Sequence, residues 1–187
     1  TFQRVFEHLD PKAFNRAFMD WTNKLCDNTE GRIIALDGKT LRGSTDGNKK
    51  AIHIVNAWVD ENNFENNFIL GQIKTDSKSN EITAIPELLD LLFLENSIVT
   101  IDAMGTQKDI AEKIIKRKAD YVLALKGNQG LFHKEVIEYM DYALGNKIDT
   151  INISKKRTVE KGHGRIEIRE YIQTDDIDWF HEKDKWN

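Results

Sequence analysis

The order of the apolar segments is the feature that most restricts how this chain of 187 residues can fold. Three short β-branched segments come first, separated by polar, turn-rich stretches, at residues 32–37, 51–59 and 68–73. Helical and strand patterns then alternate, at residues 81–94, 97–102, 107–118, 120–125 and 130–143. Short links between consecutive strands favour antiparallel pairing, whereas strands separated by a helix pair in parallel. The order therefore predicts a mixed sheet.

Two further patterns flank this region. Residues 10–25 are typical of an amphipathic helix, with Asp10 as its N-cap and with Phe14, Phe18 and Trp21 on the face that we expect to be buried. From Thr150 the apolar period returns to two, which predicts a β-hairpin or a small extension of a sheet.

The helical pattern at residues 107–118 has Thr106 as its expected N-cap. Its apolar residues recur at helical spacing, so we expect them to face inward: Ile110, Ala111, Ile114 and Ile115.

This order of elements is typical of the ribonuclease H-like arrangement. We predict the α/β class, with a mixed sheet, flanking helices and a small β-rich extension near the C-terminus. The expected divisions are the end of an N-terminal helical region, an incomplete core and a β-rich insertion or extension, at residues 1–30, 31–146 and 147–187.

Composition excludes several other classes of protein. The chain is 40% hydrophobic and 31% charged, which suits a globular core and argues against overall disorder. No apolar stretch approaches the roughly 20 residues of a membrane-spanning helix. The single cysteine, Cys26, excludes an internal disulfide and most cysteine-based zinc sites, and it fits a reducing compartment.

Charge is distributed unevenly along a chain whose net charge is −4. Residues 31–50 carry five basic side chains against two acidic ones, and residues 147–169 carry seven against three. Such basic stretches can contact phosphates even in an acidic chain. Solvated surface charge explains the same pattern, so charge alone does not separate the two interpretations.

Asp37 and Asp102 are the candidate catalytic and metal-binding residues, because each ends a short apolar strand and is followed by a loop. Ligands of α/β sheets bind at the carboxyl ends of the strands. Two carboxylates there would bind Mg²⁺ or Mn²⁺, and two such ions support phosphodiester chemistry. An Asp at a strand end is also a common turn former or helix cap, and this alternative stays open.

Five segments resemble, in order, the motifs of the ISAs1 family of insertion-sequence transposases, also called H-repeat-associated proteins. They are IALDGKTLRGS from Ile34, SNEITAIPELL from Ser79, DAMGTQ from Asp102, DYVLALKGNQ from Asp120 and GHGRIEIR from Gly162. The resemblance covers nearly the whole chain. It implies a ribonuclease H-like fold and DDE chemistry, the metal-dependent cleavage and strand transfer of an element's DNA ends.

The resemblance also assigns individual residues. Asp37 matches the first catalytic Asp of the family and Asp102 the second, with Mg²⁺ or Mn²⁺ as the cofactor. The third acid of the family lies further toward the C-terminus, in a motif that this chain lacks, so we expect it beyond Asn187 in a longer protein, of which this chain lacks both ends. Glu167 is an alternative third acid, although an ion pair with Arg165 or Arg169 on the same strand face explains it equally.

Six residues are candidates for contacts with the DNA backbone. Two follow the first acid, one ends the expected strand beside the second acid, and three lie in the second basic stretch. They are Lys39, Arg42, Lys126, Lys161, His163 and Arg165. Contacts with phosphates position DNA without reading its sequence. A solvated side chain or an exposed turn remains the alternative for each of them.

We therefore expect a DDE transposase that acts on transposon ends and target DNA in the bacterial cytoplasm, associated with the nucleoid when it acts, with no membrane partner. A homodimer is an assembly that the resemblance implies. Two alternatives stay open: a hydrolytic ribonuclease H-like nuclease, and an inactive remnant that only binds DNA or a full-length transposase.

Overall fold

The computed structural model describes residues 2–25, 31–45, 51–60, 68–75, 81–146, 151–162 and 164–186. These residues form two compact units, Thr1–Leu125 and Lys126–Trp186, and each unit is described by itself. The division into residues 1–30, 31–146 and 147–187 stays a prediction about the family's organisation.

The first unit is built on a five-stranded sheet with the order β3-β2-β1-β4-β5. Its strands are β1 (Ile33–Leu41), β2 (Ile52–Asp60), β3 (Phe68–Thr75), β4 (Ile98–Ile101) and β5 (Asp120–Leu123). Strand β1 pairs antiparallel with β2, and β2 with β3, whereas β1, β4 and β5 run parallel. The mixed sheet and the ribonuclease H-like fold class predicted from the order of segments are confirmed.

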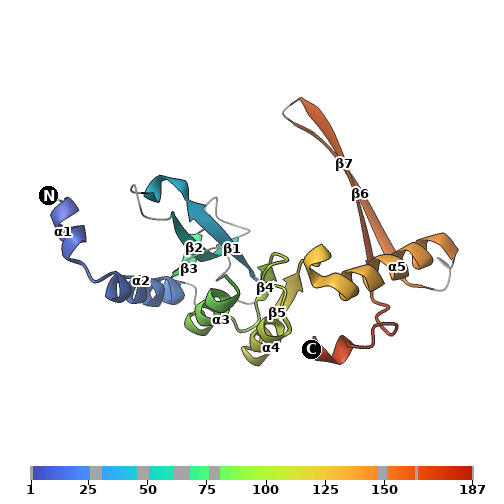
Figure 1. Ribbon diagram of the computed structural model, residues 1–187, viewed down its shortest axis with the longest axis horizontal. Coiled ribbons are helices and arrows are strands. Elements are labelled where there is room, and N and C mark those ends of the chain that lie inside the picture. The colour runs from blue at the N-terminus through green and yellow to red at the C-terminus, as the bar shows by residue number, and fades with distance from the viewer. Residues whose placement is uncertain are drawn as a thin grey trace. The chain divides into compact units, whose positions relative to one another are not determined.

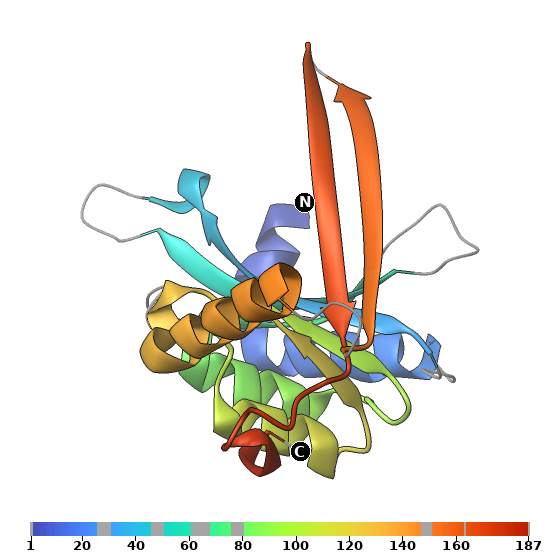
Figure 2. The same cartoon turned by 90° about the vertical axis from the view of Figure 1, so that its right-hand side faces the viewer.

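Helices cover one face of this sheet. The helices of the unit are α1 (Phe2–His8), α2 (Pro11–Leu25), α3 (Glu81–Leu91) and α4 (Lys108–Lys116). Figure 1 shows α2, α3 and α4 on the same side of the strands, and Figure 2 shows the same arrangement from a second direction. No helix in the described ranges is long and apolar enough to cross a membrane.

The core lies between this sheet face and the helices, because side chains alternate between the faces of a strand. Ile34 and Leu36 of β1 are buried on the covered face, and Val55 and Val59 of β2 lie beside them. The helices contribute apolar side chains to the same cluster, among them Ala84, Leu88, Leu89, Ile110 and Ile114. Residues of β1 between the buried positions point to the opposite face.

Helix α2 begins where the sequence predicted but buries a different stripe. The Asp10 carboxylate accepts two backbone N–H groups of the first turn, so the predicted N-cap is confirmed. The expectation of a buried aromatic face is wrong for Phe14 and Trp21, which are 52% and 57% exposed, whereas Phe18 is partly buried against the core. Met19 and Thr22 are buried instead, and the Thr22 hydroxyl donates to a β3 carbonyl 2.6 Å away.

The second unit contains α5 (Gly130–Asn146) and a two-stranded hairpin, β6 (Ile153–Gly162) with β7 (Arg165–Thr174). The predicted hairpin is therefore confirmed. Aromatic stacking holds the segment after β7 against α5: Phe132 stacks on Phe180 and Tyr139 on Trp179, with ring centroids 4.4 and 4.6 Å apart. Short 3₁₀ turns lie at Arg42–Ser44, Gly127–Gln129 and Lys183–Lys185.

Replacing Gly105 with alanine tests how tightly the loop after β4 packs. A Cβ atom there would overlap Ile101 Cγ2 and would lie 2.7 Å from Ile85 Cδ1, so these side chains must move. We expect Gly105→Ala to lower the free energy of unfolding by about 1–3 kcal/mol, measured by urea denaturation. Gly43→Ala is the control, because no atom lies within 4 Å of the place that its Cβ would occupy and its stability should be unchanged.

Candidate active site

The two candidate acids lie at neighbouring positions because β1 and β4 are adjacent and parallel. The last residue pair of this ladder joins Leu36 to Ile101, and Asp37 and Asp102 are the next residues along the chain. The prediction that each acid ends its strand holds for Asp102, which follows β4, but it is wrong for Asp37, because pairing with β2 continues β1 to Leu41. Neighbouring strands lie about 4.8 Å apart. Both acids are exposed, while Leu36 and Ile101 are buried against the helices. The alternation of side chains thus directs Asp37 to the face opposite the helices, and Asp102 follows a residue buried on the helical side.

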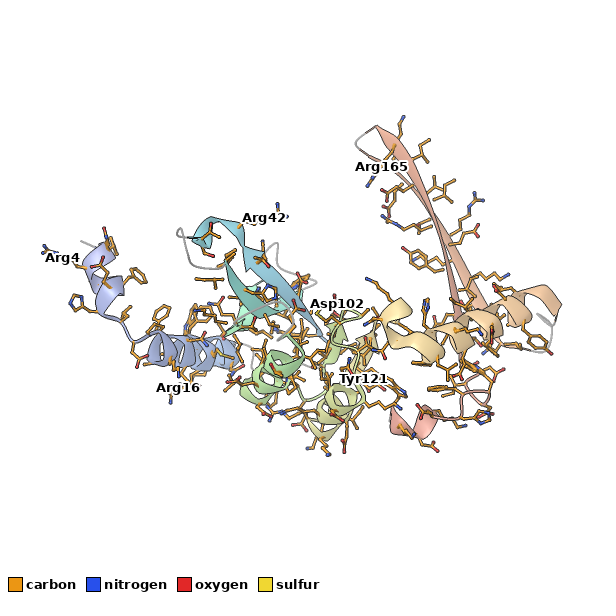
Figure 3. All side chains as sticks on the ribbon, viewed as in Figure 1. Arg4, Arg16, Arg42, Asp102, Tyr121 and Arg165 are labelled. Atoms are coloured by element: carbon orange, nitrogen blue, oxygen red, sulfur yellow. The ribbon has the colours of Figure 1, made fainter. Side chains whose placement is uncertain are left out.

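The loop after β4 holds Asp102 through several hydrogen bonds. The backbone N–H of Met104 donates to Asp102 Oδ1 at 3.0 Å. The Thr106 hydroxyl contacts the carbonyl oxygens of Asp102 and Ala124, at 3.2 and 2.6 Å. Thr106 therefore ties this loop to the chain after β5. Figure 3 labels Asp102 at the end of β4.

The interpretation of Thr106 as a helix cap is wrong. Helix α4 begins at Lys108, its N-cap position is Gln107, and the Gln107 side chain makes no capping hydrogen bond. The Thr106 side chain turns toward the loop because buried carbonyl oxygens there need a donor. Of the residues predicted to face inward, Ile115 is 40% exposed, and the others are buried as expected: Ile110, Ala111 and Ile114.

Asn56 is a polar residue of the site that the sequence analysis missed. It is the partner of Asp37 in the antiparallel β1–β2 ladder, so both side chains lie on the same face. Its Oδ1 atom is buried and accepts no hydrogen bond in the described part of the chain. A buried amide oxygen without a donor is costly and suggests a missing partner. An isolated polar residue within an apolar strand was the available signal.

These three residues fit a hard divalent cation. Asp37 and Asp102 supply carboxylate oxygens, and Asn56 supplies an unpartnered amide oxygen beside Asp37. Mg²⁺ is commonly held by one or two carboxylates, with water completing its coordination. Among the described residues, no three His, Cys, Asp or Glu side chains gather closely enough to form a fuller metal site.

Two of the predicted DNA-contacting residues border an open hollow formed by the part of β1 that follows Asp37 and by the turn after it. The hollow measures about 810 Å³ and is lined by residues 38–44 together with His53. Lys39 and Arg42 are exposed there. Figure 3 shows Arg42 beyond the end of β1, on the side of the sheet away from α2 and its Arg16.

The remaining predicted DNA contacts belong to the second unit. Lys126 precedes the 3₁₀ turn before α5, and Lys161 lies at the end of β6; both are exposed. Arg165 begins β7 and is also exposed. His163 lies outside the described residues.

Glu167 is engaged by two arginines of its own strand face. Arg165 lies 2.5 Å from one carboxylate oxygen, and Arg169 pairs with the other. Arg169 also reaches Glu160 on β6, at 3.0 Å. The ion pairing expected as the alternative explanation of Glu167 is confirmed. Its role as a third acid stays an untested hypothesis.

Comparison with known proteins gives one family and several relatives. Residues 28–181 match the family described as the Transposase DDE domain. The chain is 48% identical over 174 residues to "Putative transposase YncI" of Escherichia coli K12. It is 44% identical over 179 residues to "H repeat-associated putative transposase YhhI" of the same organism. It is 41% identical over 194 residues to the "Uncharacterized protein in dhlA 3'region" of Xanthobacter autotrophicus.

These relatives are longer than the chain. The matches cover 92%, 94% and 100% of this chain, respectively, but 67%, 45% and 61% of the relatives. The chain thus spans about half to two thirds of the length of the curated relatives it matches.

Replacing Glu167 with glutamine tests whether it contributes to metal binding. Because its two oxygens pair with Arg165 and Arg169, we expect Glu167→Gln to leave the Mn²⁺ affinity within two-fold of the parent, about 0.4 kcal/mol. Calorimetric titration measures the affinity. A loss of ten-fold or more would identify Glu167 as a ligand and would contradict this expectation.

Proposed function

The chain belongs to the family of DDE transposase domains, and from this premise we propose that it cleaves the DNA ends of an insertion sequence and joins them to target DNA. The proposal rests on the parallel pairing of β1 with β4. Asp37 and Asp102 each come directly after the last residue pair of this ladder, Leu36 with Ile101, and therefore lie at neighbouring positions. Asp102 follows the carboxyl end of β4, and Asp37 lies beside it within β1. Two neighbouring acids there would form a site for phosphodiester chemistry.

Asp37, Asp102 and Asn56 are the residues that would hold a divalent cation. When bound, such an ion supplies Lewis-acid stabilisation of the phosphate oxygens and a nucleophilic oxygen at neutral pH. The chain's own contribution is to fix its oxygens before the ion arrives. The Met104 N–H and the Thr106 hydroxyl hold the Asp102 loop, and the sheet holds Asp37.

Lys39 and Arg42 would contact the DNA backbone next to the acids. Both are exposed, both follow Asp37 in the chain, and both border the same hollow. Lys126, Lys161, His163 and Arg165 are proposed as further contacts on the evidence of sequence and charge. Contacts of this kind orient the scissile strand and set affinity without reading sequence.

Within the family, we assign the chain to the ISAs1 group. The five ordered motifs support this assignment, as do relatives whose names include "H repeat-associated". Action on DNA in the bacterial cytoplasm follows from this assignment, and assembly as a homodimer is part of the same proposal.

A Mn²⁺ titration tests the acid pair. We expect the parent to bind Mn²⁺ and both Asp37→Asn and Asp102→Asn to bind at least ten-fold more weakly, because each loses a charged ligand. Asn56→Leu should weaken binding by a smaller factor, since it removes a neutral ligand. Calorimetry of the folded proteins gives all four affinities.

Asp120→Asn is the matched control for this titration. Asp120 is an exposed carboxylate of the same sheet, but it begins β5 and pairs with Ile98 at the opposite end of β4. Its variant should bind Mn²⁺ as the parent does. Unchanged affinity in both Asp37→Asn and Asp102→Asn would refute the metal site.

The salt dependence of DNA binding tests the basic pair. We expect the double variant Lys39→Ala, Arg42→Ala to bind a duplex oligonucleotide more weakly and with a shallower salt dependence. The slope of log affinity against log salt changes by about 0.9 for each lost phosphate contact, so about 1.8 for two. Fluorescence anisotropy at several salt concentrations measures the slope.

The control pair for this measurement is Lys12 and Arg16, which are exposed on α2. Replacing both with alanine removes the same charge from a helix on the covered side of the sheet. We expect the parent slope in this control. Equal flattening in both double variants would mean that net charge, and not a local contact, controls binding.

A further inference from the structure

A row of hydrogen-bonded polar side chains, Glu81, His53 and Thr40, lies near the proposed site; its first two members are buried and Thr40 is exposed. His53 and Glu81 are only 3% and 5% exposed, and His53 Nε2 lies 2.6 Å from Glu81 Oε1. The other ring nitrogen, Nδ1, lies 2.9 Å from the Thr40 hydroxyl. In the tautomer that carries its hydrogen on Nε2, the His53 ring donates to the Glu81 oxygen and Nδ1 accepts from the Thr40 hydroxyl. Three elements, α3, β2 and β1, are thus joined by one hydrogen-bonded chain.

The presence of these three hydrogen-bonded polar side chains needs an explanation, because apolar residues fill most of the same sheet face. A buried His–Glu pair of this kind is often no more stabilising than apolar side chains of similar volume. His53 occupies the position of β2 that precedes the buried Val55 and Ala57 on this face. Stability therefore gives no clear reason for the pair, whereas fixing a local geometry does.

The geometry that the pair fixes is that of β1 just after Asp37. A Cβ atom on Gly38 would overlap Glu81 Oε1, so the carboxylate packs directly against the β1 backbone. The Thr40 side chain is held by its hydrogen bond with His53. Residues 38 and 40 lie on the same strand face as His53, and Asp37 and Lys39 lie on the other face. Thr40 is exposed, because it lies where the hollow opens on its own face.

The segment held in this way forms the rim of the hollow. Ser44 fixes the end of this segment. Its hydroxyl donates to the Leu41 carbonyl at 2.5 Å and accepts the Ile52 N–H at 2.7 Å. The described residues that line the hollow include two cations, two hydroxyls and an imidazole, and none of these described residues is acidic. A hollow with this lining suits an anion.

We propose that this hollow is a subsite for one phosphate of the bound DNA strand, and that Glu81, His53 and Thr40 are positioning residues for it. Lys39 and Arg42 contact the phosphate. The hydrogen-bonded chain sets the backbone from which these two cations project, so the phosphate is held at a constant place relative to Asp37. The inference rests on the proposed action on DNA and adds three residues that the proposed function does not use.

The test removes the hydroxyl of Thr40 and follows DNA binding. Thr40→Val keeps the shape of the side chain and breaks the hydrogen bond to His53. We expect about ten-fold weaker binding of a duplex oligonucleotide and a salt slope shallower by about 0.9, the effect of one lost phosphate contact. Thr40→Ser restores the hydroxyl and should restore both values. Mn²⁺ affinity should stay at the parent value in both variants.

Thr22→Val is the matched control for loss of a hydroxyl. Thr22 is a threonine whose hydroxyl donates to the Leu70 carbonyl at 2.6 Å, where α2 meets β3. Its variant should keep the parent slope even where it unfolds more easily. An equal change of slope in Thr22→Val and Thr40→Val would overturn the proposal, because both would then act through general stability.

A double-mutant cycle tests whether Glu81 acts through Thr40. Glu81→Gln keeps an acceptor for Nε2 but removes the charge. We expect it to flatten the slope of log DNA affinity against log salt when it is introduced into the parent, and to have little further effect when it is combined with Thr40→Val. If the two substitutions changed the slope additively, the proposal that Glu81 acts through Thr40 would be overturned. If Lys39→Ala, Arg42→Ala changes the slope but Thr40→Val does not, the inference fails and the proposed DNA contact stands. If neither changes it, both fail.

Discussion

The proposed site depends on one pairing, that of β1 with β4. These strands are far apart in the sequence, and their parallel alignment places Asp37 and Asp102 one step beyond the last pair of the ladder, Leu36 with Ile101. Packing of Leu36 and Ile101 against the helices sets the face on which Asp37 emerges. A shift of one residue in either strand would turn an acid into the core, so the hydrophobic core and the site constrain each other.

Alternation along β1 separates two tasks. Asp37 and Lys39 point to the open face, where a metal ion and a DNA strand would bind. Gly38 and Thr40 lie on the face of His53, where Glu81 and His53 hold the backbone. The residues proposed to bind the ligands therefore alternate along β1 with the residues through which the strand is held. His53 and Glu81 are buried, so the part of the support that packs against the β1 backbone is shielded from water.

Much of the fold and part of the site could be predicted from the sequence. The antiparallel and parallel pairings follow from the lengths of the connecting segments. The two acids were identified as the ends of short strands, which is true of Asp102 but not of Asp37, because β1 continues to Leu41. Thr106 and the aromatic face of α2 were interpreted wrongly, since which side of a helix or loop is buried depends on distant partners such as Leu70 and Ala124. Asn56 was missed because a single polar residue in a strand has no periodic signature.

The sequence by itself determined the local helices and strands. It also identified the candidate acids, Asp37 and Asp102, and the candidate basic residues after the first acid. All of these can be recognised from short patterns of hydrophobicity and charge. Only the tertiary structure decided that Asn56 lies beside Asp37 and that Glu81 reaches His53, 28 residues away in the chain. The physical reason is that strand register and helix docking are set by the packing of the whole core. Contacts between segments distant in the sequence exist only once that packing has formed.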